Sequence, residues 1–264
     1  MLESTYIKPI VYACPTCKRH LFTMENALLC IECGRMYPVV GGIPNFVMED
    51  TLVSVAPNYR WIKMLEFLAP VYQSQLWTLF TLTLVGAKRS SFQSTARFIL
   101  ETLKDVTGTV LEVACGPATY GRRIATPKRN VYGIDFCMSP LQQGMKKIAR
   151  EGVTGVRLSR SNVTELPFEN DVFDGGTCIA ALHLFPDTLH ALREIARTMK
   201  AGATLAMTTF VAGNAPLSQI MERDRDLHLY QILDLQYLMS DAGFEKFEPK
   251  LDGNWLMFST HKAI

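Results

Sequence analysis

Apolar residues gather into short runs in the second half of the chain, and glycine-containing turns separate these runs. Residues 109–114 (TVLEVA) form a nearly continuous apolar run directly after Gly108, and residues 131–135 (VYGID) form another. Short runs of this kind predict buried strands. Because a glycine-containing turn and a predicted helix lie between them, the pattern favours an α/β domain with helices on both faces of a parallel sheet.

The alternation of strands and helices continues towards the C-terminus. Asp187 precedes a segment with apolar residues at helical spacing, which predicts a helix that Asp187 caps and that ends before Gly202. The apolar face of this helix contains Leu189, Leu192, Ile195 and Met199. The remaining predicted elements are a strand over residues 204–210, a helix over residues 234–242 and a closing pair of strands over residues 244–249 and 255–260.

Helical spacing of apolar residues also marks residues 48–107, which we expect to form a connecting segment ahead of the α/β domain. One predicted helical face contains Trp61, Met64, Leu65, Leu68 and Tyr72. Residues 76–85 are too apolar for a helix surface in water, so they must pack on another apolar surface. Two interpretations stay open: ordinary packing on the main domain, or a lid over an apolar substrate pocket.

Four cysteines occur in two C-x-x-C motifs near the N-terminus. They are Cys14, Cys17, Cys30 and Cys33, with twelve residues between the motifs that can supply a hairpin. Four thiolates hold Zn²⁺ tetrahedrally in closed, structural sites. Two disulfides, or four unrelated thiols, are the alternatives. We expect a zinc ribbon over residues 1–47 with a core separate from that of the larger domain, and with a fold that depends on the metal.

Composition limits the partners of the protein. The chain has 264 residues, 48% of them hydrophobic, and a formal charge of +2. This balance argues against nucleic acid as the substrate, because nucleic-acid binders concentrate positive charge. The longest apolar run, residues 76–85, is too short to span a membrane. Residues 1–13 do not read as a secretory signal, so we expect a cytoplasmic protein. The oligomeric state leaves no mark on the sequence.

The turn after the first predicted strand is a candidate cofactor loop. It contains Ala114, Gly116, Ala118 and Gly121, a degraded form of the G-x-G-x-x-G pattern of nucleotide-binding units. Asp135 ends the second predicted strand, where a carboxylate can accept both ribose hydroxyls or can simply cap the following turn. A dehydrogenase would need the intact glycines to seat a pyrophosphate, so Ala118 argues against one.

Five segments resemble class I S-adenosylmethionine-dependent methyltransferases of the ubiquinone/menaquinone type. Residues 111–116 (LEVACG) and 133–135 (GID) look like the first two motifs of that class. Residues 162–174 (NVTELPFENDVFD) are similar to the run D-A-x-x-L-P-F-x-D-x-x-F-D of the family. Residues 182–187 (LHLFPD) and 199–203 (MKAGA) resemble its L-H-H-x-P-D and L-K-P-G-G segments. The resemblance covers residues 108–264 and implies a Rossmann-like sheet of seven strands. Residues 1–47 resemble the small zinc ribbons that serve or precede such enzymes.

The resemblance implies S-adenosylmethionine as the cofactor and assigns its binding residues. Glu112 would lie under the methionine amine, Gly116 would let the backbone approach the cofactor, and Asp135 would hold the ribose. Asn162 and Val163 would meet the adenine edge. The full predicted set is Glu112, Ala114, Gly116, Asp135, Phe136, Asn162, Val163 and Ile179.

Three residues depart from the family pattern. Ala118 replaces a glycine, Asn162 replaces an aspartate and Leu184 replaces the second histidine. Asparagine still offers an acceptor oxygen to the adenine amino group. Methyl transfer from a sulfonium needs no phosphate cradle, but only a cofactor held at its polar ends and a nucleophile in line with the methyl–sulfur bond.

His183 is the predicted general base, and Tyr72 is a second candidate at the acceptor site. His183 comes after the predicted strand that carries Ile179, at the edge where ligands meet open α/β sheets. A neutral imidazole there could take a proton from the acceptor, and a histidine merely buried at a helix entrance is the alternative. Residues 214–230 could also line the acceptor site or form a solvated, charged helix.

Three functions are consistent with these features. The favoured one is methyl transfer to a small, apolar acceptor such as a quinone, a lipid or a natural-product precursor. The second is a ribosomal-RNA methyltransferase whose ribbon binds RNA, although Lys18, Arg19 and Arg35 are few for that purpose. The third is a non-catalytic binding protein with an altered cofactor site.

Overall fold

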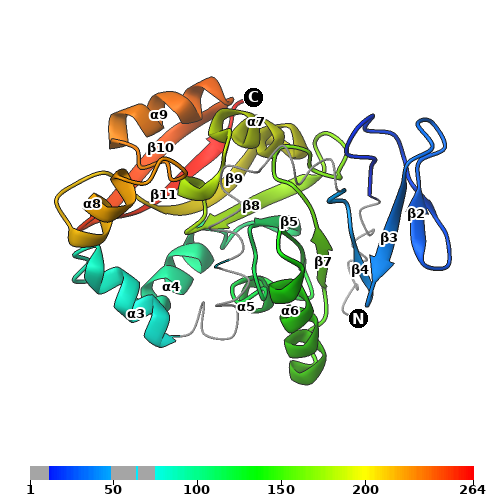
Figure 1. The fold of residues 1–264 in the computed structure, drawn as a ribbon, viewed down its shortest axis with the longest axis horizontal. Helices are drawn as coiled ribbons and strands as arrows, with labels where there is room; N and C mark the ends of the chain where they lie inside the picture. Colours follow the sequence, from blue (N-terminus) through cyan, green and yellow to red (C-terminus); the bar gives the residue numbers. More distant parts are fainter. Residues whose placement is uncertain (1–11, 49–63, 65–74) are drawn as a thin grey trace.

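The computed structural model describes residues 12–48, Met64 and residues 75–264, and within these ranges the chain forms two β-sheets (Figure 1). A small antiparallel sheet of four strands comes first in the chain, and a sheet of seven strands comes second. The predicted α/β class and the seven-stranded sheet are confirmed. Trp61, Leu65, Leu68 and Tyr72 of the predicted helical face lie outside the described residues.

The large sheet has the strand order β10-β11-β9-β8-β5-β6-β7. Its strands are β5 (Gly108–Val113), β6 (Arg129–Asp135), β7 (Val156–Arg160), β8 (Phe173–Ile179), β9 (Met199–Phe210), β10 (Phe244–Asp252) and β11 (Trp255–Lys262). The strands from β9 to β7 are parallel, whereas β11 is antiparallel to both of its neighbours. The chain reverses its direction of progress at β5, which lies between β6 and β8. Ligands of open α/β sheets bind at the carboxyl ends of the strands beside such a reversal.

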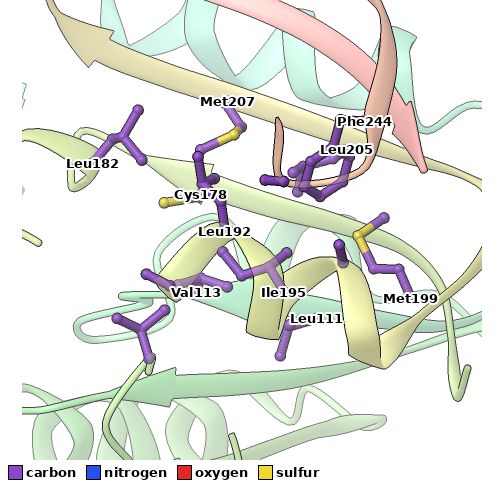
Figure 2. Close-up of a cluster of buried hydrophobic side chains, with 14 of the residues drawn as sticks. Leu111, Val113, Cys178, Leu182, Leu192, Ile195, Met199, Leu205, Met207 and Phe244 are labelled. Carbon is purple, nitrogen blue, oxygen red and sulfur yellow. The ribbon is translucent and has the colours of Figure 1, made fainter. Parts of the chain in front are cut away.

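Helices cover both faces of the large sheet. They are α3 (Gln75–Leu84), α4 (Phe92–Thr102), α5 (Gly121–Ile124), α6 (Met138–Glu151), α7 (Thr188–Thr198), α8 (Pro216–Glu222) and α9 (Ile232–Asp241). Val110 of β5 lies in one apolar cluster with Phe98 of α4. Its neighbour Leu111 points to the opposite face, because side chains alternate along a strand, and lies in the cluster of Leu192 from α7 (Figure 2).

The predicted elements after residue 180 are present with shifted boundaries. Asp187 caps α7, since its carboxylate accepts the N–H of His190 across 3.0 Å. The predicted helix over residues 234–242 is α9, and the predicted closing strands are β10 and β11. Residues 214–230 contain the short helix α8, so only part of that stretch is helical.

The N-terminal sheet is a ribbon. Its strands are β1 (Phe22–Thr23), β2 (Ala27–Leu29), β3 (Met36–Val40) and β4 (Ile43–Pro44), each antiparallel to the next. Gly41 and Gly42 have φ values of +58° and +80°, which glycine adopts without steric cost, and they form the turn between β3 and β4. The predicted hairpin between the cysteine pairs and the predicted Gly-Gly turn are therefore present.

The ribbon lies along β7, at the edge of the large sheet (Figure 1). Asn45 forms a parallel bridge with Arg160, the last residue of β7, and the Phe46 N–H donates to the Arg160 carbonyl across 2.8 Å. Ile43 of β4 is fully buried in an apolar cluster that it shares with residues of the large domain. The ribbon has a small apolar cluster of its own, as expected, but Ile43 shows that the ribbon is also packed against the larger domain.

Helix α3 covers most of the apolar stretch 76–85 of the connecting segment. Its residue Leu82 and the following Val85 are buried in a cluster with Phe210 and Trp255 of the large sheet. The interpretation as packing on the main domain is thus confirmed for Leu82 and Val85, whereas Leu76, Leu79 and Phe80 are exposed. Among the described residues, no helix is both long and apolar enough to cross a membrane.

Candidate functional site

The candidate cofactor loop comes directly after β5 and adopts an unusual backbone conformation. Ala114, Gly116 and Ala118 each have a φ of +52°, in the left-handed region. Alanine enters this region at a cost of roughly 1–2 kcal/mol, so two such residues in one loop require support from their surroundings. The loop leads into α5, and its position at the carboxyl end of β5 beside the chain reversal is where cofactors bind in such sheets.

Asp135 connects this loop to the end of β6. One carboxylate oxygen (Oδ2) accepts the N–H of Gly116 across 2.7 Å, and the other (Oδ1) accepts the N–H of Cys137 across 2.8 Å. A carboxylate oxygen has two lone pairs and can accept more than one hydrogen bond, so these two bonds do not prevent contact with ribose hydroxyls. The turn-capping interpretation and the cofactor interpretation of Asp135 are therefore compatible.

A cavity of about 110 Å³ lies between the loop and the ends of the strands. Six of the predicted cofactor residues line it, namely Ala114, Gly116, Asp135, Phe136, Asn162 and Val163. The cavity is completed by residues that the sequence analysis did not select, among them Cys137, Pro140, Ser161, Ala181, Phe185 and Pro186. Phe185 and Pro186 belong to the motif segment 182–187, so their place in that motif was the available signal.

Glu112 and Ile179, also predicted for the cofactor, are not among the residues that line this cavity. Glu112 is buried, and its Oε1 accepts the N–H of Gly121 across 3.0 Å, while its Oε2 has no hydrogen-bond partner. Burial raises the pKa of Glu112 to about 8. The Glu112 carboxyl group thus holds the end of the cofactor loop through Gly121, and its second oxygen has no hydrogen-bond partner among the described residues.

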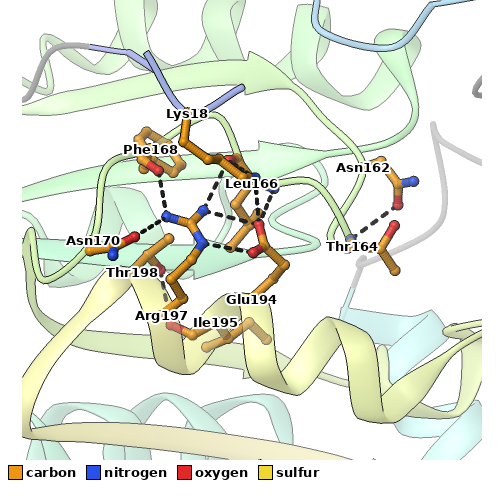
Figure 3. Close-up of polar contacts among 10 residues, drawn as sticks. All are labelled: Lys18, Asn162, Thr164, Leu166, Phe168, Asn170, Glu194, Ile195, Arg197 and Thr198. Carbon is orange, nitrogen blue, oxygen red and sulfur yellow. Dashed lines mark hydrogen bonds and ion pairs between the residues drawn. The ribbon is translucent and has the colours of Figure 1, made fainter. Parts of the chain in front are cut away.

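Asn162 is nearly buried and also lines the cavity. Its Oδ1 accepts the N–H of Thr164 across 3.2 Å (Figure 3). This bond holds the next turn of the chain and leaves the amide nitrogen of Asn162 as a further donor at a cavity wall. The replacement of aspartate by asparagine therefore keeps an oxygen and adds a donor.

A second cavity of about 250 Å³ adjoins the first, and Leu184 lines both. Its walls come from α3, α4, α8, β11 and the turn after β8. The described lining residues are Met64, Trp77, Phe80, Thr81, Leu82, Leu84, Phe92, Thr95, Tyr120, Ile179, Ala180, His183, Leu184, Phe210, Leu217, Ile220, Met221, Leu227 and Trp255. None of them is acidic, and His183 is the only one with a basic side chain. The cavity therefore suits an apolar, uncharged molecule.

His183 lies in the 3₁₀ turn Leu182–Leu184 after β8, as its place in the sequence predicts. The side chain is buried, with Nδ1 at 3.4 Å from Thr209 Oγ1 and the ring centroid at 4.9 Å from that of Phe210. Burial lowers the pKa of His183 to about 3, so the imidazole is neutral at physiological pH. Tyr72, the other predicted catalytic residue, lies outside the described residues.

The four cysteines of the ribbon converge. The Sγ atoms of Cys14, Cys17, Cys30 and Cys33 all lie within 4.8 Å of one another, with 3.7 Å between Cys14 and Cys33 and 3.4 Å between Cys17 and Cys30. A disulfide would bring two sulfurs to about 2 Å, so these thiols are not joined in disulfides. Tetrahedral Zn²⁺ with bonds of about 2.3 Å needs sulfurs roughly 3.8 Å apart, which this cluster matches.

Comparisons of the sequence with known proteins identify methyltransferases as its relatives. Residues 110–202 match a family described as a methyltransferase domain. The chain is 26% identical to an uncharacterised chloroplastic methyltransferase of Arabidopsis thaliana, in an alignment that covers 96% of this chain and 78% of the relative. It is 34% identical over 110 residues to the demethylmenaquinone methyltransferase of Listeria monocytogenes. That alignment covers 40% of this chain and spans 46% of the relative, less than half of its length.

Solved structures share the fold at low identity. The [4+2]-cyclase SpnF is 17% identical, with a TM-score of 0.61 over 76% of this chain and 94% of that one. Phosphoethanolamine N-methyltransferase 2 of Haemonchus contortus, solved with S-adenosyl-L-methionine, is 15% identical, with a TM-score of 0.60 over 75% of this chain and 59% of that one. Since the cyclase and the methyltransferase share this fold, the likeness speaks for the architecture and leaves the acceptor to be argued from the cavities.

Proposed function

Because this chain belongs to the class I S-adenosylmethionine-dependent methyltransferases, we propose that it methylates a small, uncharged, apolar acceptor, such as a quinone, a lipid or a natural-product precursor. One observation carries the proposal: a cavity whose described lining residues include no lysine, arginine, aspartate or glutamate adjoins the candidate cofactor cavity, and Leu184 lines both. This arrangement would bring the acceptor next to the methyl donor while excluding water.

The residues of the smaller cavity fit S-adenosylmethionine. The Asp135 carboxylate can accept the ribose hydroxyls, and Asn162 presents an amide to the adenine. Glu112 does not line this cavity, so its contact with the methionine amine stays a prediction from the sequence. When bound, S-adenosylmethionine supplies a methyl group on a positively charged sulfur. Orientation of the acceptor and exclusion of water fall to the protein.

The proposed reaction is a single displacement. The nucleophilic atom of the acceptor forms a bond to the methyl carbon, the carbon–sulfur bond breaks with its electron pair going to sulfur, and the acceptor's proton passes to solvent. His183 suits the role of hydrogen-bond acceptor for the nucleophile, since it is neutral and lines the larger cavity. A pKa of about 3 makes this imidazole a poor final site for the proton, so we assign it orientation rather than general-base catalysis.

The walls of the larger cavity also bear on the class of acceptor. A phosphate or an ammonium group would need oppositely charged partners, and the described lining residues include no arginine, lysine, aspartate or glutamate. An acceptor like that named for the Haemonchus enzyme is thus disfavoured, and an apolar one like that named for the Listeria enzyme is favoured. Trp255, in the same wall, has a buried indole N–H without a partner in the described part of the chain, which an oxygen of the acceptor would supply.

The RNA alternative gains no support from the ribbon. Lys18, one of its few basic residues, contacts Glu194 of the large domain across 2.9 Å, so its charge is neutralised inside the protein.

The alternative of a non-catalytic binding protein rested on Ala118 and Asn162. The loop and the cavity are formed with these two residues present, so neither substitution argues that cofactor binding has been lost.

Transfer of labelled methyl groups from S-adenosylmethionine tests the proposal. The acceptors would be alkylated hydroquinones and phenols, with phosphoethanolamine and ribosomal RNA as the competing classes. Labelling of the apolar set, abolished by Leu184→Trp and kept by Leu184→Met, is expected, because the indole would fill the junction of the two cavities. Labelling of phosphoethanolamine or RNA instead would refute the assignment of the acceptor.

A further inference from the structure

The last strand of the ribbon packs against the underside of the cofactor loop. Ile43 of β4 is fully buried in an apolar cluster with Cys115 and Ala118 of the loop, and with Leu141 of α6 and Leu158 of β7. Neither Ile43 nor any other described ribbon residue lines the cofactor cavity. The ribbon thus contacts the loop outside the cofactor cavity.

This packing explains the alanine at a position where the family has glycine. Ala118 has a φ of +52° and is fully buried, and its methyl group belongs to the same cluster as Ile43. The left-handed conformation costs alanine roughly 1–2 kcal/mol, which burial of the methyl group in this cluster partly offsets. In this chain the loop, through Ala118, and the ribbon strand, through Ile43, therefore contribute to one apolar cluster.

A second contact runs from the ribbon to the wall of the cofactor cavity through Arg160. Its carbonyl accepts the N–H of Phe46, just after β4, across 2.8 Å. Its side chain turns towards the cavity, where Nε donates to the carbonyl of Phe136 across 2.9 Å and the guanidinium lies 5.7 Å from the centre of the Phe136 ring. Phe136 lines the cavity, as does Ser161, the next residue after Arg160.

A third contact fixes the segment after Asn162. Lys18 donates to Glu194 across 2.9 Å and to the Leu166 carbonyl across 3.4 Å, and Glu194 also accepts the N–H of Leu166 across 3.0 Å (Figure 3). Although burial opposes ionisation, the hydrogen bonds from Arg197 and Lys18 hold the pKa of Glu194 below its usual value. The ribbon is thus tied to three separate parts of the chain around the cofactor site.

We infer that Ile43 is a positioning residue for cofactor binding: the ribbon holds the cofactor loop in its binding conformation from outside the cavity. Arg160 is a second positioning residue, which acts through its hydrogen bond to Phe136 in the cavity wall. The inference rests on the proposed cofactor and is independent of the acceptor. It gives the ribbon a role in the catalytic domain, whereas the sequence alone predicted a ribbon with a core separate from that of the larger domain.

Calorimetric titration with S-adenosylhomocysteine tests the inference on the full, metal-loaded chain. Ile43→Ala is expected to raise the dissociation constant roughly two- to thirtyfold, the range for residues that act on a site through packing. Ile43→Val keeps most of the contact and is expected to bind almost as the wild type does. Arg160→Met, which leaves the backbone bond to Phe46 in place, is expected to weaken binding in the same direction.

Met36→Ala is the matched control, because Met36 lies in β3 of the same ribbon and its side chain is 51% exposed. Hydrogen exchange gives a readout that simple loss of stability would not reproduce: amides of the loop 114–121 should exchange faster in Ile43→Ala, while those of α7 and α9 keep their protection. Equal dissociation constants for the wild type, Ile43→Ala and Arg160→Met would overturn the inference alone. Absence of binding to the wild type would overturn the proposed cofactor as well.

Discussion

Asp135 accepts the backbone N–H of Gly116 across 2.7 Å, so the last residue of β6 closes the loop after β5. The same carboxylate accepts the N–H of Cys137 and lines the cofactor cavity. A single side chain therefore shapes the loop and offers acceptors to the cofactor. Removing it should affect the shape of the site and its affinity together.

Asp135→Ala is expected to weaken binding of S-adenosylmethionine by about 1.5–3 kcal/mol, the usual range for hydrogen bonds to a charged group, or roughly ten- to a hundredfold. Asp135→Asn keeps one acceptor oxygen, so its affinity should lie between those of the wild type and Asp135→Ala. Calorimetry measures both, with Asp241→Ala, an exposed carboxylate at the end of α9, as the control. If Asp135→Ala bound as tightly as the wild type, the ribose assignment would be wrong.

The buried Glu112 predicts an unusual dependence of stability on pH. Its pKa is raised from 4.5 to about 8 in the folded chain, so the folded state binds a proton more readily than the unfolded state does. The free energy of unfolding should therefore fall as the pH rises from about 4.5 to about 8, by at most about 1.4 kcal/mol per pH unit from this group. Above that range its contribution is constant.

Glu112→Gln removes this ionisation and isolates its effect from other titrating groups. Urea unfolding at pH 6 and pH 9 should show the variant gaining stability relative to the wild type at the higher pH. The Gln side chain still accepts the N–H of Gly121, so the loop is kept. A stability difference between the two proteins that is the same at both pH values would contradict the raised pKa.

The cysteine cluster predicts one zinc ion per chain. Removal of the zinc should change the properties of the large domain as well as those of the ribbon. Chelation is expected to lower the melting temperature and to weaken cofactor binding, because Ile43 packs on the cofactor loop and the ribbon has only a small core of its own. Added Zn²⁺ should restore both, whereas Mg²⁺, which prefers oxygen ligands, should not. Elemental analysis without stoichiometric metal, or full cofactor affinity after chelation, would count against this.

The sequence predicted the parts of the site that depend on local pattern. The strand ending in Asp135, the helix capped by Asp187 and the four converging cysteines each result from residue types at fixed spacing, and the structure contains all of them. Six of the predicted cofactor residues line one cavity for the same reason, because the carboxyl ends of neighbouring parallel strands meet at one edge.

The features that the sequence could not predict depend on contacts between distant segments. Ile43 has the pattern of an ordinary strand residue of a ribbon, and nothing in the local sequence indicates that it shares an apolar cluster with Ala118. Ile179 was predicted for the cofactor but lines the larger cavity, because its side chain points to the face covered by α4 rather than to the loop. The low basicity of His183 results from burial among residues contributed by several separate elements, which no motif records.

His183 gives the last prediction, which separates orientation from general-base catalysis. Burial lowers its pKa from 6.5 to about 3, so the unfolded chain binds a proton more readily, and the wild type should lose stability as the pH falls from about 6.5 towards 3. For the same reason His183 does not titrate between pH 5 and 8, and kcat should show no step near 6.5. His183→Gln, which keeps a hydrogen-bond acceptor, should retain more activity than His183→Phe, whose deficit is expected to reach about tenfold for one neutral hydrogen bond. A wild-type step in kcat near pH 6.5 that disappears in His183→Gln would show instead that this imidazole takes the proton.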